Sequence, residues 1–135
     1  MSTSRFLRLR TGAGTVLPLR ARRCDTFLCR LRGLMFRRKL APDEALLFVE
    51  ARESRVTTAI HMCFVFFPIG VLWLVADDAA GRDFPRSLTV VDKVLAQPFR
   101  PYYAPQAPAQ YYLEGPPALL EWVGVGEHLF LNPEP

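Results

Sequence analysis

The most apolar stretch of the chain runs from His61 to Ala76 and reads HMCFVFFPIGVLWLVA. Its uncharged part is fifteen residues long, whereas a membrane-spanning helix needs about 20. Pro68 and Gly70 lie near its middle, and both are unfavourable inside a helix. Phe, Val, Ile and Trp dominate the stretch, and these residues suit a buried sheet. The pattern therefore predicts two core strands joined by a bend at 67–70, and no membrane span.

The N-terminal quarter of the chain predicts a hairpin followed by a short helix. Apolar and basic residues alternate over 5–10, and a glycine-rich turn leads into a second strand at 15–22. Asp25 stands at the N-cap position of a helix of about two turns over 26–32. Gly33 can end that helix in the left-handed conformation.

The rest of the chain reads as further short strands and one more helix. Strands are predicted at 45–50, 56–63, 88–96, 111–114 and 127–131, and a helix at 116–124. A length of 135 residues fits one domain, and no internal repeat is visible. We therefore expect a single domain over residues 1–135 with an α+β fold. Its sheet should be mostly antiparallel or barrel-like, with two short helices.

Charge is distributed unevenly along the chain. Residues 1–40 hold eleven Lys and Arg against one acid, a net +10, so the overall charge of +4 leaves −6 for residues 41–135. Partners with phosphates or acidic surfaces are therefore conceivable on the N-terminal side. The candidate nucleic-acid contacts are Arg23, Arg30, Arg37 and Arg38. The alternative is a solvated basic surface, because Gly33 is expected to interrupt the helix that would align them.

The three cysteines indicate a reduced protein. Cys24, Cys29 and Cys63 cannot all pair within one chain, and no apolar signal segment is visible near the N-terminus. Cys24 and Cys29 are five residues apart, which is not the spacing of a C-x-x-C metal knuckle. We expect free thiols, a cytoplasmic location, no metal and no cofactor.

Catalytic signatures are sparse. His61 and Cys63 would project from the same face of a strand, where the imidazole could activate the thiol in a hydrolase-like enzyme. The alternative is that both residues simply pack in the core. No phosphate loop or nucleophile elbow is present. The sequence therefore favours a small soluble binding or accessory protein without catalytic residues, whose partner is an unidentified protein or small molecule.

One segment stands out for its tyrosines and prolines. Residues 97–112, QPFRPYYAPQAPAQYY, contain four prolines and all four tyrosines of the chain. Prolines at this spacing favour an extended path, and tyrosine offers a flat amphipathic surface. The segment predicts a flap over a ligand groove, a strip docked by a partner, or a loop packed across the sheet. Tyr102 and Tyr103 are its candidate contact residues.

Short motifs in a fixed order suggest a family. They are GLMFR at 33–37 with Leu40, LLFV at 46–49, IHM and FPI within 60–69, YYLE at 111–114, and GVGEHL at 124–129. In this order and spacing the chain resembles the domain-of-unknown-function 192 family, over about residues 15–131. The resemblance implies a compact β-rich fold and brings no established activity. The polar residues inside the motifs, Arg37, His61 and Glu114, are the candidate ligand or partner contacts.

The chain also departs from that family pattern. Gly70 stands where the pattern usually has an aspartate, and Glu114 is followed by Gly-Pro-Pro-Ala instead of a small loop ending in glycine. Glu127 replaces a common aspartate. The missing acid at position 70 is open to two interpretations: a structural turn cap, or part of a site that this chain has lost.

Overall fold

Alternating burial in the first two strands shows how the sheet closes on an apolar interior. In β1 (Phe6–Thr11), Leu7 and Leu9 are buried and Arg8 between them is exposed. In β2 (Val16–Cys24), Leu17 and Leu19 are buried in the same alternating way. Because successive side chains of a strand point to opposite faces, one face of this hairpin enters the core. The predicted N-terminal hairpin is confirmed.

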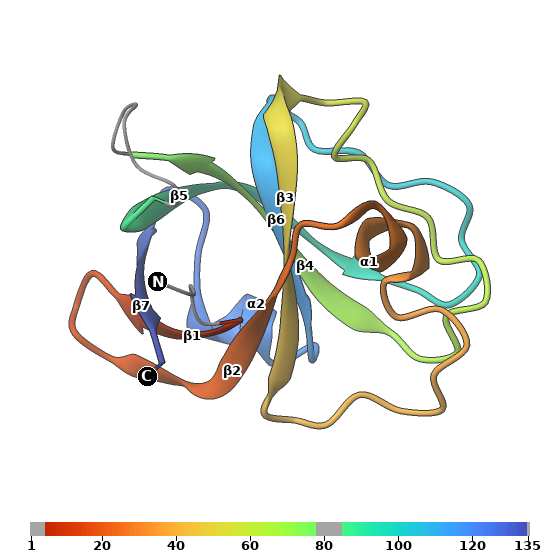
Figure 1. Ribbon diagram of the computed structural model, residues 1–135, viewed down its shortest axis with the longest axis horizontal. Coiled ribbons are helices and arrows are strands. Elements are labelled where there is room, and N and C mark those ends of the chain that lie inside the picture. Colours follow the sequence, from red (N-terminus) through yellow and green to blue (C-terminus); the bar gives the residue numbers. More distant parts are fainter. Residues whose placement is uncertain (1–4, 78–84, 135) are drawn as a thin grey trace.

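The computed structural model describes residues 5–77 and 85–134, and in them the strands close into a barrel (Figure 1). The further strands are β3 (Glu44–Ser54), β4 (Ile69–Ala76), β5 (Ser87–Ala96), β6 (Ala109–Gly115) and β7 (His128–Pro133). Their order is β1-β2-β3-β6-β4-β5-β7, and β7 pairs with β1 to close the ring. Of the described pairs, β2–β3 is parallel and the others are antiparallel.

The two helices are short. They are α1 (Phe27–Arg32) and α2 (Leu119–Trp122). Thr26, not the expected Asp25, caps α1, because its hydroxyl accepts a hydrogen bond from the Cys29 amide at 3.2 Å. Gly33 ends α1 with a φ of 49°. The predicted fold class, a mostly antiparallel barrel-like α+β protein with two short helices, is confirmed. Over residues 5–77 and 85–134, no helix is long and apolar enough to cross a membrane.

The prediction for the apolar stretch 61–76 is only half right. Ile69–Ala76 forms β4, but residues 61–68 form a loop, and the strand expected at 56–63 is reduced to one isolated bridge between Ile60 and Tyr103. Phe64 has a φ of 58°, a conformation that a strand does not contain. The segment just before this loop is anchored to the barrel, because the Trp73 indole N–H donates to the Thr58 carbonyl oxygen at 2.7 Å.

Three strands are buried on both faces, and this creates a second core outside the barrel. In β3, Leu47 faces the barrel interior whereas Phe48 belongs to the outer core. In β6, Leu113 faces inward and Tyr112 outward. In β4, Trp73 also lies in the outer core. Figure 1 shows α1 and the long connections gathered on this outer side of β3, β6 and β4. Glu114, the residue after Leu113 in β6, therefore lies beneath this cover.

A disulfide ties the cover to the barrel. Cys24 at the end of β2 is bonded to Cys29 in α1. The expectation that all cysteines are free thiols is therefore wrong for this pair, while Cys63 is free. The expectation rested on the odd number of cysteines and on the lack of a signal segment, and neither shows that Cys24 at the end of a strand lies beside Cys29 in the following helix. The bond fixes the start of the segment that leads to Gly33.

Candidate functional site

A small cavity lies where four of the sequence motifs, GLMFR, LLFV, IHM and YYLE, meet. Its volume is about 70 Å³, and it lies between α1, the segments 33–35 and 59–65, and the outer face of β3 and β6. The apolar side chains that line it include Leu34, Met35, Phe48, Met62, Val65 and Tyr112. The cavity therefore accepts one small chemical group and not a whole drug-sized ligand.

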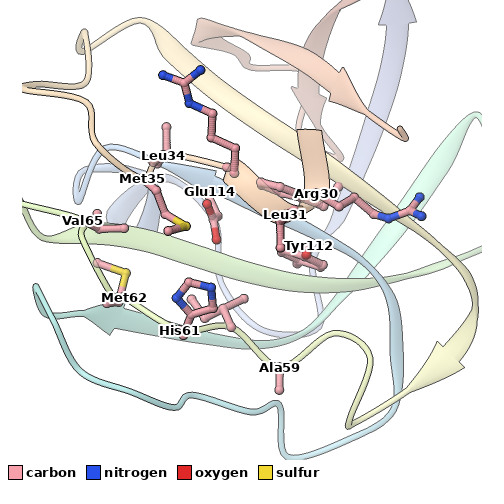
Figure 2. Close-up of a pocket in the computed structure, with 14 residues that line it drawn as sticks. Arg30, Leu31, Leu34, Met35, Ala59, His61, Met62, Val65, Tyr112 and Glu114 are labelled. Carbon is pink, nitrogen blue, oxygen red and sulfur yellow. The ribbon is translucent and has the colours of Figure 1, made fainter. Parts of the chain in front are cut away.

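Glu114 is the one acid of this lining. Its side chain points into the middle of the pocket in Figure 2, and only 7% of the residue is exposed. Within the described part of the chain its carboxyl group makes no hydrogen bond and no ion pair, but its oxygens are not among the fully buried unpaired atoms, so they keep some contact with solvent. Burial raises the pKa of Glu114 to about 8, because desolvation penalises the charged form. At neutral pH the group is therefore mostly a neutral carboxylic acid, able to donate and to accept a hydrogen bond.

Two stacked aromatic rings lie in the lining of the pocket. Tyr112 stacks on Phe48 with ring centroids 4.5 Å apart and planes 2° apart. Burial raises the pKa of Tyr112 far above its ordinary value, and the nearby acids Glu114 and Glu50 add to this rise. The phenol therefore stays neutral at physiological pH. The stacked pair of Tyr112 and Phe48 forms an aromatic wall of the cavity.

His61 stands at the edge of the same pocket (Figure 2). Its Nδ1 accepts a hydrogen bond from the Cys63 amide at 3.2 Å, so the neutral ring carries its proton on Nε2. The side chain of Arg30 runs away from the pocket centre in Figure 2. There its guanidinium pairs with Glu50 at 3.4 Å and donates to backbone oxygens of Asp25 and Val49. His61 and Arg32 are thus the other side-chain nitrogen donors in the lining besides Arg30.

The other candidate contacts lie elsewhere. Arg37 pairs with Glu44 at 2.7 Å and holds the pKa of that acid below its usual value, in a separate groove beyond Gly33. Tyr103 forms the bridge to Ile60, and its hydroxyl accepts a hydrogen bond from the Gln97 amide at 2.9 Å. Tyr102 is 63% exposed. The structure therefore brings His61 and Glu114 together but does not bring Arg37, Tyr102 or Tyr103 to the cavity.

The arginines predicted for nucleic acid are mostly engaged with acids. Arg23 pairs with Asp25 at 3.1 Å, and Arg30 and Arg37 pair with Glu50 and Glu44. Arg38 is exposed. Because α1 ends at Gly33, these side chains do not form one helical stripe. Nucleic-acid binding stays a prediction that this arrangement does not favour.

The arrangement expected for a His61–Cys63 nucleophile is also different. Both residues lie on the loop 61–68 and not on a strand. The hydrogen bond between them joins the Cys63 amide to the imidazole, so it involves the backbone and not the thiol. The geometric premise of the hydrolase interpretation is therefore wrong.

A polar cluster that the sequence did not reveal lies at the opposite end of β4. Asp77 accepts hydrogen bonds from Ser87 and Thr89, and its carboxylate lies 2.8 Å from Nδ1 of His128. Although burial opposes it, these partners hold the pKa of Asp77 below its ordinary value. Thr89 contacts the same ring nitrogen as Asp77, so the hydroxyl, imidazole and carboxylate are not in series as a nucleophilic triad requires. Among the residues described, no three His, Cys, Asp or Glu side chains gather as a metal site.

Many of the lining residues that sequence reasoning missed lie inside motifs already noted, whereas Leu31, Arg32, Ala59 and Val65 lie outside them. Gly33, Leu34 and Met35 come from GLM, and Met62 follows His61. Phe48 lies in LLFV, and Tyr112 precedes Leu113 and Glu114 in YYLE. The signal was therefore present as the short motifs themselves, but only the fold shows that they share one cavity.

A closed β-barrel whose outer face is covered by a short helix and loops, with a buried carboxyl beneath them, defines the class of this protein. The chain belongs to the DUF192 family, described as "Uncharacterized ACR", whose model matches residues 9–128. The resemblance noted in the sequence is thereby confirmed.

Relatives and solved structures agree with this placement. A UPF0127 protein of Thermococcus kodakarensis is 40% identical over 103 residues, which are 76% of this chain and 57% of that protein. A UPF0127 protein of Pyrococcus furiosus is 33% identical over 121 residues, which are 88% of this chain and 92% of that protein. This chain thus spans little more than half of the Thermococcus relative and nearly all of the Pyrococcus one.

The solved structures show the same fold at low sequence identity. A Sinorhizobium meliloti protein described as a candidate transcription regulator superposes with a TM-score of 0.74 at 24% identity, covering 98% of this chain and 96% of that one. A protein of unknown function from Novosphingobium aromaticivorans gives a TM-score of 0.66 at 20% identity, covering 92% and 82%.

Proposed function

We propose that this domain is a non-catalytic binding module whose site is the Glu114 pocket. The observation that carries the proposal is a nearly buried carboxyl, without a partner in the described residues, directed into a small cavity with apolar walls and basic side chains at its edge. A carboxyl that is poorly hydrated and has no protein hydrogen bond costs stability. A ligand group that supplies the missing bond offsets this cost, and this makes Glu114 a binding residue.

The chemistry of the site selects the ligand group. A neutral carboxylic acid pairs well with a carboxamide, because each group donates one hydrogen bond and accepts one. The cavity holds about 70 Å³, so the carboxamide enters alone and the remainder of the ligand lies outside. His61 Nε2 provides a second donor at the edge. The proposed ligand is therefore a protein or small molecule that presents a small neutral polar group on an apolar stem.

Small probes of matched size test the proposal by protein NMR. At pH 6.5 we expect propionamide to cause saturable shifts of residues 33–35, 61–65 and 112–114, with affinity in the millimolar range of about −4 kcal/mol. Propylammonium should bind more weakly than propionamide at pH 6.5. Its affinity should rise at pH 9, where Glu114 is ionised. In Glu114→Gln the carboxamide keeps its partner, so propionamide binding should persist without the dependence on pH.

Glu114→Leu provides the loss-of-binding control. It keeps the volume of the side chain but removes both hydrogen-bonding functions, so it should abolish the propionamide shifts. Equal binding by this variant, or the absence of saturable shifts with any probe at both pH values, would refute the proposal.

Two expectations from the sequence stand beside this proposal. The folding of residues 1–135 as a single domain stays a prediction. The cytoplasmic location also stays a prediction, and the Cys24–Cys29 bond weakens its support, because such bonds are typical of oxidising compartments.

A further inference from the structure

Four phenylalanine side chains form an exposed cluster beside the pocket. Phe36, Phe64, Phe66 and Phe99 are each about half exposed, at 58%, 48%, 51% and 52%. Phe36 stacks on Phe64 at 4.9 Å, and Phe99 contacts Phe64 at 6.2 Å and Phe66 at 5.4 Å. We refer to these residues as the phenylalanine cluster. A contiguous exposed apolar patch of this kind is a hallmark of an interaction surface.

Three of these rings are carried by residues with a strained backbone conformation. Phe36, Phe64 and Phe99 have φ values of 66°, 58° and 64°, and they are the described non-glycine residues with positive φ. Bulky residues rarely adopt this conformation, and backbone strain of this kind concentrates at functional positions. The Phe36 amide donates to the Phe64 carbonyl oxygen at 2.9 Å, and the Phe99 amide to that of Met62 at 2.8 Å. These bonds join three loops, so the rings are held at the surface together.

The charges on these loops have one sign. The segments 33–42, 56–68 and 97–108 contain Arg37, Arg38, Lys39 and Arg100 and no acid. Arg37 is paired with Glu44, but in the described residues Arg38, Lys39 and Arg100 are exposed and have no ion pair. The phenylalanine cluster is thus flanked by three unpaired cations. An occupant of this surface should be apolar at its centre and negatively charged around it.

We propose that the phenylalanine cluster docks this domain onto the surface of an anionic lipid bilayer. Aromatic side chains that enter the boundary between headgroups and acyl chains, with Lys and Arg around them, are the usual basis of such attachment. The inserted loops must satisfy their backbone groups internally, and the amides of Phe36, Met62 and Phe99 do so by bonding across the loops. Single-stranded nucleic acid fits less well, because rings stacked at 4.9 Å leave no gap for a base.

Vesicle co-sedimentation tests this proposal. The protein should bind vesicles that contain phosphatidylglycerol about a hundredfold more tightly than vesicles of phosphatidylcholine alone, since three basic residues near an anionic surface each contribute to binding. The difference should shrink in high salt. Failure to bind phosphatidylglycerol vesicles at low salt would overturn the proposal.

Replacing the strained phenylalanines by glycine removes the rings without harming the fold. Glycine adopts positive φ without strain, so the triple variant Phe36→Gly, Phe64→Gly, Phe99→Gly should fold while its vesicle affinity falls at least about tenfold. The matched control is Val16→Ser, which removes an exposed apolar side chain at the start of β2 and should bind normally.

Two further results with the triple variant would overturn the proposal. Vesicle binding by the triple variant equal to that of the unmodified protein would overturn the proposal. So would a dimer that the same variant converts to a monomer, since the cluster would then be an interface between two copies of the chain. Glu114→Leu leaves the cluster intact and should bind vesicles normally, so failure here is separate from failure of the proposed pocket function.

Discussion

Glu114 Oε1 lies 3.7 Å from the position that a Cβ atom would occupy on Gly33. Gly33 ends α1 with a positive φ and has no side chain to fill the space above the acid. The carboxyl therefore faces a cavity and not a packed neighbour. This relationship joins a backbone requirement at the helix end to the chemistry of the pocket, and the first predictions concern its acid.

The protein should lose stability as pH rises from about 4.5 to about 8. Glu114 ionises near 4.5 in the unfolded chain but only near 8 in the folded protein, so folding takes up a proton between these values. Stability from this group is fully present below pH 4.5 and falls by up to about 1.4 kcal/mol per pH unit above it. Urea unfolding of the native protein and of Glu114→Gln at pH 5, 6.5 and 8 measures the effect.

Glu114→Gln isolates the contribution of this acid, because other groups titrate alike in both proteins. The difference in free energy of unfolding between the two proteins should change with pH. At pH 8 the variant should be more stable, relative to the native protein, than it is at pH 5. A constant difference across this range would show that Glu114 ionises normally in the folded state.

Glu114→Leu should be more stable than the native protein at pH 8, by about 1–3 kcal/mol. Leucine fills a similar volume, packs against Met35 and Phe48, and has no polar group to desolvate. Thermal and urea unfolding measure the change. Glu121→Leu, an exposed position in α2, is the matched control and should give no such gain. A loss of stability in Glu114→Leu would mean that the acid holds the fold together.

Counting reactive thiols before and after reduction tests the disulfide. Iodoacetamide should label one cysteine, Cys63, in the denatured, unreduced protein and three after reduction. Closing a loop of this length should stabilise the fold by about 2 kcal/mol, so reduction should lower the free energy of unfolding by that amount. Labelling of three thiols without reduction would show that the bond is absent from the purified protein.

Much of the barrel could be predicted from alternation, but the site could not. In YYLE the alternation shows that Tyr112 and Glu114 share a face, yet it does not show which face is the barrel interior, since both are buried. The loop 61–68 has the composition of a strand, and it departs from one because Phe64 adopts a left-handed conformation stabilised by contacts to distant loops. Neither kind of contact is encoded in local periodicity.

The cysteine error has the same origin. The odd number of cysteines and the lack of a signal segment favoured free thiols, and the spacing of Cys24 and Cys29 did not show that they meet. In the fold, β2 continues to Cys24 because it pairs in parallel with β3, as in the register of Cys24 with Phe48. That non-local pairing extends the strand, and the turn before α1 then brings the two sulfur atoms together.

Two segments that depart from the family pattern, Gly70 and the turn after Glu114, lie against each other. Gly70 pairs with Gly115, and a Cβ on Gly70 would lie 2.9 Å from the Pro116 carbonyl oxygen and 3.2 Å from Leu120 Cγ. The turn that follows β6 therefore occupies the space that an aspartate at position 70 would need. Position 70 also does not line the Glu114 pocket, so an acid there would not complete that site.

Gly70→Ala should therefore destabilise the protein by about 1–3 kcal/mol, because the new methyl group must displace a backbone carbonyl. Gly70→Asp should cost more, since it adds a buried charge to the same overlap. Urea unfolding measures both, and Gly12→Ala is the control, because no atom lies within 4 Å of a Cβ at that position. If Gly70→Asp were as stable as the native protein, the turn at Pro116 would yield easily, and the glycine would not be required by packing.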